Sequence, residues 1–340
     1  MTLTREQSEG REYDILAPEA AKAAESKGRR REEEPCQYRT AFQRDRDRII
    51  HSKAFRRLMH KTQVFIAPEG DHFRTRLTHT LEVSQIARSI ARSLRLNEDL
   101  TEAIALGHDL GHTPFGHSGE AALAKVYPGG FRHNAQSLRV VDVLDSNERR
   151  RGMNLTEEVR DGILHHTGPG VPMTLEGRIV KTADRIAYIN HDIDDALRSG
   201  LISPSDLPEG PVLRLGATTR DRIDCLIRDM VESSDGAGDI LQSPSAKAAM
   251  DELRNYLFEN VYFSPRVKSA EDQAMVLRAV TGLYEYYKAH PEGLPAEYAK
   301  LLPEFGAAEM AKDHVASMTD RFAREDYARI AGAAAGTTRP

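Results

Sequence analysis

Cysteine is scarce in this sequence, and long apolar runs are missing. Only two cysteines, Cys36 and Cys225, occur in 340 residues, and neither has a CxxC or CxH companion. This excludes a disulfide framework and a thiolate zinc site, and it is typical of a reducing compartment. No segment approaches eighteen consecutive apolar residues, and the first residues lack the basic-then-apolar pattern of a signal peptide. We therefore expect a soluble, cytoplasmic protein with no membrane segment.

Strand patterns are also missing. Apolar and polar residues never alternate for more than a few positions, whereas apolar residues such as Leu81, Ile86 and Ile90 recur at helical spacing. Asn97, followed by two acidic residues, is a good N-cap for the next helix. The sequence predicts an all-α fold. The predicted helices span 78–94, 97–109, 135–144, 156–165, 175–199, 217–231, 246–262 and 270–289, with one or two more within 40–65 and several pieces over 303–329.

Length and charge set the expected organisation. A chain of this length with 40% hydrophobic residues can bury a large core. The net charge of −5 gives no reason to expect general nucleic-acid binding, but residues 29–61 hold eleven Lys or Arg against five Asp or Glu. That local positive field suits a small polyanion. We expect a mobile arm over 1–36, a helical core over 37–200, a C-terminal helical extension over 201–330 that packs on the core, and a flexible tail over 331–340.

Four of the thirteen histidines lie between residues 77 and 120. His108 and Asp109 are adjacent near the end of an apolar helix, where a buried carboxylate is costly unless a cation pairs with it. His79 opens the preceding helix. Imidazole and carboxylate together suit Mn, Fe, Co, Ni, Zn or Mg. A solvated His–Asp pair at a helix end is the alternative.

A second polar group lies further along the chain. Asp184, Tyr188 and Asp192 are spaced at i, i+4 and i+8, so they form one polar stripe on an otherwise apolar helix. An acid, a phenol and an acid that face inward need a ligand. An exposed, salt-bridged helix face would give the same spacing.

These motifs resemble a known family. His79, His108–Asp109 and Asp184 follow the pattern of the HD superfamily of metal-dependent phosphohydrolases. The segments "RLTHTLEVSQIARSIAR", "GHDLGHTPFGHSGE", "FRHNAQSLRVV" and "KTADRIAYINHDIDDA" are similar to its deoxyguanosinetriphosphate triphosphohydrolase branch of dNTPases, and "SMTDRF" near the C-terminus is similar too. The resemblance covers residues 13 to 323.

The resemblance implies an HD-domain helical core with additional C-terminal helices, and a role for each residue that matches the family's motifs. A divalent ion, Mn, Mg or another first-row transition metal, is expected as cofactor. The implied metal ligands are His79, His108, Asp109 and Asp184, the implied catalytic pair is His117 and Glu120, and the implied substrate contacts are Arg76, His112, His133, Arg185, Tyr188, Asp192 and Gln63.

The implied reaction is hydrolysis of a 2′-deoxynucleoside 5′-triphosphate, dGTP or several dNTPs, to deoxynucleoside and inorganic triphosphate. His117 would accept or donate a proton, and the sequence leaves both roles open. A second dNTP as activator and a hexameric or tetrameric homo-oligomer are further expectations. The alternatives are another HD phosphohydrolase that acts on nucleoside monophosphates or signalling nucleotides, and a nucleotide-responsive protein that binds single-stranded DNA or a partner. His165 and His166 are interpreted as structural residues at a helix end, and the alternative is that they support the ligands from behind.

Overall fold

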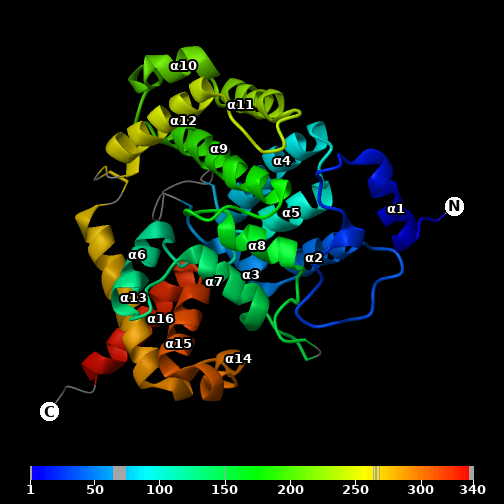
Figure 1. The fold of residues 1–340 in the computed structure, drawn as a ribbon. Coiled ribbons are helices and arrows are strands. Elements are labelled where there is room, and N and C mark those ends of the chain that lie inside the picture. The colour runs from blue at the N-terminus through cyan, green and yellow to red at the C-terminus, as the bar shows by residue number, and fades with distance from the viewer. Residues whose placement is uncertain are drawn as a thin grey trace.

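The computed structural model describes residues 2–63, 74–148, 150–262, 264, 266–267 and 269–336, the side chains of 333–336 excepted. Within these residues the chain forms sixteen α-helices and no β-strand, with only three isolated bridges (Figure 1). The predicted all-α fold is confirmed. The helices are α1 (Arg5–Ile15), α2 (Ala41–Ile50), α3 (Lys53–Arg57), α4 (Arg76–Ser93), α5 (Glu98–Gly107), α6 (Gly116–Val126), α7 (His133–Arg139), α8 (Glu157–His165), α9 (Leu175–Arg198), α10 (Glu209–Leu215), α11 (Thr219–Ser234), α12 (Pro244–Leu257), α13 (Ala270–Ala289), α14 (Ala296–Ala299), α15 (Leu302–Ser317) and α16 (Asp320–Gly336).

Side-chain caps fix the starts of the helices that carry the predicted site. Asn97 accepts a hydrogen bond from the backbone N–H of Leu100, so the predicted N-cap of α5 is confirmed. Thr75 caps α4 and Thr174 caps α9 in the same way. Because α4 begins two residues earlier than predicted, Arg76 lies in its first turn.

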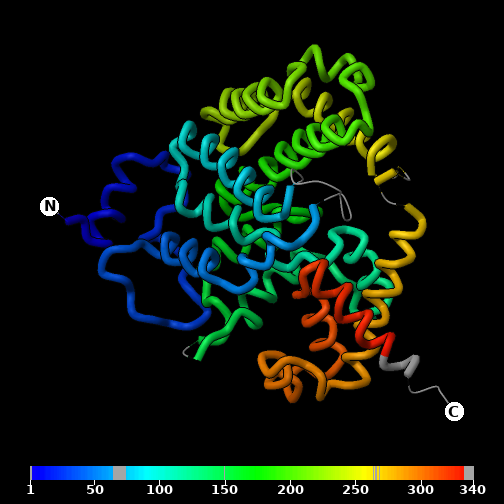
Figure 2. The backbone as a smooth tube through the Cα atoms, turned by 180° about the vertical axis from the view of Figure 1, so that it is seen from behind, coloured from blue at the N-terminus to red at the C-terminus, as the bar shows by residue number. Residues whose placement is uncertain are grey.

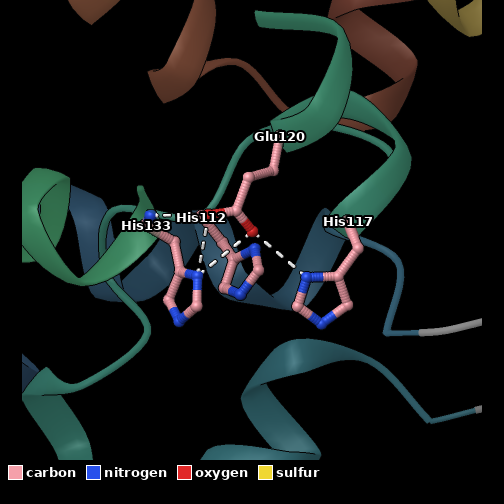
Figure 3. A group of neighbouring side chains, drawn as sticks. All are labelled: His112, His117, Glu120 and His133. Carbon is pink, nitrogen blue, oxygen red and sulfur yellow. Dashed lines mark hydrogen bonds and ion pairs between the residues drawn. The ribbon is translucent and has the colours of Figure 1, made fainter. Parts of the chain in front are cut away.

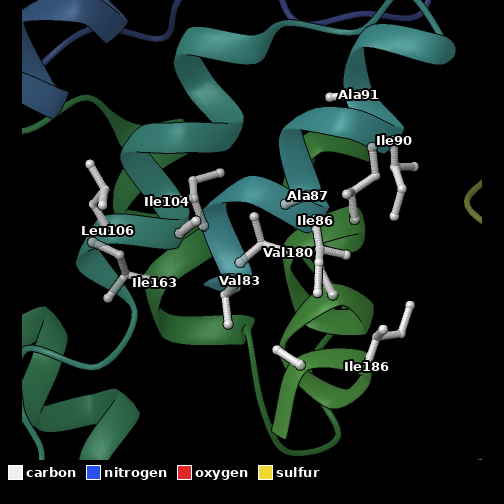
Figure 4. Close-up of a cluster of buried hydrophobic side chains, with 14 of the residues drawn as sticks. Val83, Ile86, Ala87, Ile90, Ala91, Ile104, Leu106, Ile163, Val180 and Ile186 are labelled. Carbon is white, nitrogen blue, oxygen red and sulfur yellow. The ribbon is translucent and has the colours of Figure 1, made fainter. Parts of the chain in front are cut away.

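Helices α4, α5, α8 and α9 pack around the main hydrophobic core (Figure 4). Two glycines allow α5 and α8 to approach closely. A Cβ atom on Gly107 would lie 2.6 Å from Ile163, and one on Gly162 would lie 2.6 Å from Ile104. The C-terminal ends of α5 and α8 are therefore neighbours, and each of these helices is followed by a histidine, His108 or His166.

A second hydrophobic core joins α6 to the C-terminal helices α13, α15 and α16. Figures 1 and 2 show α10–α12 beside α9 at one end of the molecule and α13–α16 at the other. Phe115, which precedes α6, is buried in this second core. The segment that carries His117 and Glu120 is thus anchored on the C-terminal half of the chain. Helix α6 itself was not among the predicted helices.

Residues 2–36 differ from the predicted mobile arm, because several of their side chains contact the core. Glu12 of α1 is buried and accepts hydrogen bonds from the backbone of Ala23 and from the side chain of Asn97. Arg29 forms a buried ion pair with Asp45 of α2. Polar composition suggested disorder, but these polar groups are paired with polar groups of the core.

The chain end also differs from the prediction. Helix α16 continues to Gly336, so the first part of the predicted tail at 331–340 is helical, and residues 337–340 lie outside the described part of the chain. No described helix is long and apolar enough to cross a membrane.

Candidate metal centre and substrate cavity

The four predicted metal ligands come from three neighbouring elements and meet at one point. His79 lies in the first turn of α4, His108 and Asp109 follow α5, and Asp184 lies in the middle of α9. Nε2 of His79 is 3.0 Å from Oδ1 of Asp184, and Nε2 of His108 is 3.6 Å from Oδ1 of Asp109 and 3.8 Å from Oδ1 of Asp184. Two imidazoles and two carboxylates within this range form a donor set for a divalent ion.

The orientation of His108 fits metal binding. Its Nδ1 lies 2.6 Å from the carbonyl oxygen of Ala105, which assigns the proton to Nδ1. Its Nε2 is buried and has no hydrogen-bond partner among the described residues. A ligating histidine commonly donates its outer N–H to a carbonyl or carboxylate in this way. The lone pair of Nε2 is thereby left for an ion.

Both carboxylates in this group are held in the ionised form. Burial acts to raise the pKa of Asp184, but the hydrogen bond with His79 outweighs burial and the pKa falls to about 2. Burial likewise acts to raise the pKa of Asp109, but the surrounding positive groups, among them the Arg76 guanidinium that donates to it, hold that pKa well below its usual range. Ionised carboxylates are the form that ligates a metal.

Glu120 lies between two histidines (Figure 3). Its Oε2 is 3.1 Å from Nδ1 of His117, and its Oε1 is 3.0 Å from Nδ1 of His133 and accepts the backbone N–H of His133 at 2.8 Å. Burial acts to raise the pKa of Glu120, but both histidines outweigh it and lower that pKa far below its ordinary value. The predicted pair of His117 and Glu120 is therefore part of a triad with His133. The His112 ring stacks on the His133 ring with centroids 4.2 Å apart.

A strained turn places His117. Phe115 has a left-handed backbone, with φ of 64°, and Gly116 follows with φ of 56°. Left-handed geometry is costly for a bulky residue, so the surroundings must hold it. The carboxylate of Asp320, at the start of α16, accepts the backbone N–H of Phe115 at 2.9 Å and that of Thr62 at 3.0 Å. Asp320 lies in the "SMTDRF" segment, to which the sequence assigned no role.

A cavity of about 720 Å³ opens beside the predicted metal ligands. This volume falls in the range of small-ligand sites. Of the predicted substrate contacts, all except Arg185 line the cavity. The predicted site residues that line the cavity are Gln63, Arg76, His79, Asp109, His112, His117, His133, Asp184, Tyr188 and Asp192. Lining residues that were not predicted from the sequence include Lys125, Arg254, Phe258, Tyr262 and Leu277.

Arg76 combines burial with unpaired donors. Its Nη1 donates to Oδ2 of Asp109 at 2.7 Å, whereas its Nε and Nη2 are buried without a partner among the described residues. Buried guanidinium donors without an acceptor are costly, and an anion in the cavity would satisfy them.

Arg185 has a different position from the one predicted. Its side chain donates to Asp251 of α12 at 2.6 Å, and it does not line the cavity. Arg254, also on α12, is the arginine that reaches the cavity from this side. Arg185 follows Asp184 directly on a helix, so the two side chains point about 100° apart around the helix axis.

Asp192 has a partner that the sequence did not reveal. The hydroxyl of Tyr262 donates to its carboxylate at 2.5 Å. Burial raises the pKa of Asp192 to about 7, against the lowering effect of this hydrogen bond. The predicted helix over 246–262 contained Tyr262. The amphipathic pattern of that helix is equally typical of a helix that only packs against a core, so nothing in the sequence distinguished Tyr262 as a cavity residue.

His166 is the clearest omission. It was interpreted as a structural residue at a helix end, yet its ring centroid lies 4.9 Å from that of His108 and 5.3 Å from that of His133. The only sequence signal was its place in the pair His165–His166. Three groups of described residues could hold a metal ion, and they are His79, His108 and Asp109; Asp109, His133 and His166; and His112, His117, Glu120 and His133.

Comparisons with known proteins identify two matching family models. A family model described as HD domain matches residues 76–189, and one described as phosphohydrolase-associated domain matches residues 240–329. A solved structure of a hypothetical protein from Aquifex aeolicus aligns over 84% of this chain and 70% of that chain, with 22% identity and a TM-score of 0.44, a similarity too weak to bear on function.

Three curated relatives cover nearly the whole chain, and each is named deoxyguanosinetriphosphate triphosphohydrolase-like protein. The relative from Caldanaerobacter subterraneus subsp. tengcongensis is 55% identical over 96% of this chain and 95% of its own length. Those from Desulfatibacillum aliphaticivorans and Clostridium tetani are 50% and 43% identical, over 96% and 94% of this chain and 97% and 93% of their own lengths. The chain therefore belongs to the deoxyguanosinetriphosphate triphosphohydrolase-like family of HD-domain hydrolases.

Proposed function

We propose that this protein hydrolyses 2′-deoxynucleoside 5′-triphosphates to deoxynucleoside and inorganic triphosphate, with a divalent metal ion held by His79, His108, Asp109 and Asp184. One observation carries the proposal. The donor set of two imidazoles and two carboxylates opens onto a cavity that also contains unpaired donors of Arg76. The names of the relatives support the same reaction.

The ion would be Mn, Mg or another first-row transition metal. When bound, it would polarise the phosphoryl group and make water acidic enough to react near neutral pH. The protein side chains supply the remaining steps. Water loses a proton as its oxygen forms a bond to the α-phosphorus, the bond from that phosphorus to the 5′-oxygen breaks, and the 5′-oxygen gains a proton.

His117 is the side chain that moves a proton in this scheme. Glu120 accepts a hydrogen bond from its Nδ1, so its Nε2 is free to exchange a proton with water or with the 5′-oxygen. The side chain of His117 remains 66% exposed and lines the cavity, so substrate can reach it. Glu120 stabilises the protonated ring.

Positive and polar side chains would bind the two ends of the substrate. Arg76 lies where its unpaired Nε and Nη2 can donate to phosphate oxygens, and Lys125 adds a second charge on the cavity wall. Tyr188 would pack against the deoxyribose, and Asp192 would accept a hydrogen bond from the 3′-hydroxyl. A ribonucleotide would then bring its 2′-hydroxyl against the Tyr188 ring.

Product analysis tests the proposal. Purified protein is incubated with each dNTP, singly and mixed, with Mn²⁺ or Mg²⁺, and the phosphate product is identified by ³¹P NMR. Inorganic triphosphate and free deoxynucleoside are expected, and chelation should abolish their formation until metal is added back. Orthophosphate, pyrophosphate or a mononucleotide as the product would refute the proposal in favour of another HD phosphohydrolase. Turnover only in dNTP mixtures would indicate an activating nucleotide.

A further inference from the structure

Helices α6 and α13 pack side by side and form one wall of the substrate cavity (Figure 1). Ala121 on α6 and Ala274 and Leu277 on α13 give this wall an apolar surface. Leu277 is 40% exposed, so this apolar surface is in contact with water until a ligand covers it. Lys125 lies near the C-terminal end of α6 and lines the cavity on the same side. We call this surface the α6–α13 wall.

The α6–α13 wall suits the nucleobase of the proposed substrate better than the other two parts of that substrate. Phosphate oxygens need positive donors, and Arg76 on α4 offers buried, unpaired ones. The deoxyribose is assigned in the proposed function to Tyr188 and Asp192 on α9. A base has two flat faces that gain free energy from contact with apolar side chains, so the apolar wall is the surface that fits it. Helix α13 also begins shortly after Tyr262, the partner of Asp192.

Lys125 reaches over this wall from the same helix as His117. His117, Ala121 and Lys125 are spaced at i, i+4 and i+8, so they share one face of α6. Side chains on a helix lean toward its N-terminus, which directs the ammonium group of Lys125 back toward Ala121. Apart from His117, Lys125 is the only ionisable residue among the described cavity-lining residues of α6 and α13. A base on the wall therefore meets an ammonium group and no carboxylate of these two helices.

The chemistry of an ammonium group decides which base edges it can bind. It carries three N–H donors and no acceptor. Guanine presents two acceptors, O6 and N7, and thymine presents O4, whereas cytosine presents the N4 amino donor and adenine combines N7 with an N6 amino donor. An amino group that faces the ammonium group leaves both donors without an acceptor, which costs free energy. An ammonium group therefore favours keto bases over amino bases.

We propose that Lys125 is a specificity-determining residue for the reaction of the proposed function, on which this inference rests. The nucleobase lies on the α6–α13 wall, and the ammonium group of Lys125 donates to O6 and N7 of guanine or to O4 of thymine. The protein therefore hydrolyses dGTP and dTTP in preference to dATP and dCTP.

Phosphate binding is the competing role for the charge of Lys125. An ammonium group that contacts the triphosphate attracts every dNTP equally, because all dNTPs carry the same triphosphate. Removal of the charge would then lower the four rates of hydrolysis by one factor and leave their ratios unchanged. The two roles are therefore separated by the ratios of the rates.

A competition assay measures these ratios directly. The full chain is incubated with all four dNTPs at equal concentrations and with Mn²⁺, and the four deoxynucleosides are quantified by chromatography at early times. The initial rates in one mixture are in the ratio of the kcat/KM values, so an inactive fraction of the protein cancels. Any dNTP that is needed as an activator is present for every substrate. In the wild type, we expect deoxyguanosine and thymidine to exceed deoxyadenosine and deoxycytidine by about 10-fold.

Two substitutions of Lys125 test the assignment. In Lys125→Ala, the preference for keto bases should fall by about 10-fold, because the donor is lost. In Lys125→Glu, a carboxylate can accept from the N4 amino group of cytosine, so dCTP should become preferred over dTTP. Lys247→Ala is the matched control, because Lys247 is an exposed lysine of α12 that does not line the cavity. It should keep the wild-type ratios.

A nucleotide analogue gives a measurement that needs no variant. In 7-deaza-dGTP, a C–H group replaces the acceptor N7 of guanine. We expect the wild type to hydrolyse it several-fold more slowly than dGTP in competition, because one of the two acceptors for Lys125 is missing. Lys125→Ala should hydrolyse the two nucleotides at equal rates.

The outcomes separate this inference from the proposed function. If inorganic triphosphate is formed but the wild type shows no preference for keto bases, or one that Lys125→Ala leaves unchanged, the assignment of Lys125 is overturned and the proposed function stands. Equal rates for 7-deaza-dGTP and dGTP in the wild type would also overturn the assignment. Absence of hydrolysis of any dNTP would overturn both.

Discussion

Replacement of Asp320 by asparagine should impair catalysis without removing metal. The Asp320 carboxylate accepts three hydrogen bonds, one from the backbone of Phe115 to Oδ1 and two from the backbone and hydroxyl of Thr62 to Oδ2. An asparagine side chain has only one oxygen, so it can accept hydrogen bonds from Phe115 or from Thr62 but not from both. Its NH₂ group then faces the donor of the other residue. Loss of a hydrogen bond to a charged group costs about 1.5–3 kcal/mol. We expect the free energy of unfolding to fall by that amount.

The effect on activity follows from the position of the Asp320 clamp, by which we mean the hydrogen bonds that join Asp320 to Phe115 and Thr62. The left-handed backbone of Phe115 costs on the order of 1–3 kcal/mol, which the surrounding contacts must offset. When the bond from Asp320 is lost, this turn can relax, and His117 lies only two residues further along. A displacement of about 1 Å can lower turnover by on the order of 10²-fold. We expect kcat to fall and KM for dNTP to change little, since Arg76 and Tyr188 lie on other helices.

Three measurements on Asp320→Asn check this reasoning. Urea unfolding gives the stability change, steady-state kinetics separate kcat from KM, and elemental analysis gives metal content, which should equal that of the wild type. Glu325→Gln is the control, because Glu325 is an exposed residue of the same helix, paired with Arg321. If Asp320→Asn unfolds at the same urea concentration as the wild type and keeps its kcat, the clamp does not position His117.

Four further predictions follow from the structure and the family. His117→Ala should keep metal and bind dNTP while kcat falls by about 10²–10⁴-fold, and a wild-type rate would contradict its role as the proton-transfer group. Tyr188→Ala should weaken deoxynucleotide turnover and relax discrimination against ribonucleotides, whereas an unchanged ratio of kcat/KM values would exclude this residue from sugar selection. Burial raises the pKa of Glu176 to about 7, against hydrogen bonds from the backbone of Asn97 and Ala21. The folded state therefore loses stability as pH rises from about 4.5 to 7. In denaturant unfolding, the free energy of unfolding of Glu176→Gln should exceed that of the wild type by up to about 3 kcal/mol at pH 8 and by nothing at pH 4. An equal difference at both pH values would contradict the raised pKa. Light scattering should show a homo-oligomer, hexamer or tetramer, and a fully active monomer would disprove that assembly.

Helical periodicity was sufficient to predict the part of the site that lies within single elements. The spacing of Asp184, Tyr188 and Asp192 predicted one face of a helix, and that face lines the cavity. Asn97 was correctly predicted as the cap of α5, because capping depends on a few adjacent residues. Helical spacing and helix capping can be predicted because both depend only on residues that are near one another in the sequence.

Contacts between distant segments could not be predicted in the same way. Arg185 was predicted at the phosphates from its place beside Asp184, but the fold turns it toward Asp251. His166 gave no signal beyond adjacency to His165, because its position beside His108 depends on how closely α5 and α8 pack. Tyr262 is far in sequence from the residue it contacts, Asp192. Each outcome depends on tertiary packing that periodicity does not encode.

The C-terminal helices complete the site as well as covering the core. Lys61 is fully buried, where burial lowers the pKa of its amine to about 7, and its Nζ donates to the carbonyl oxygens of His112 and Ala316. Asp320 joins the turn before His117 to the segment at Thr62. Both links run from the histidine-bearing loop to α15 or α16. A chain without these helices would leave a buried amine and a strained turn without their partners, so the position of His117 depends on the C-terminal helices.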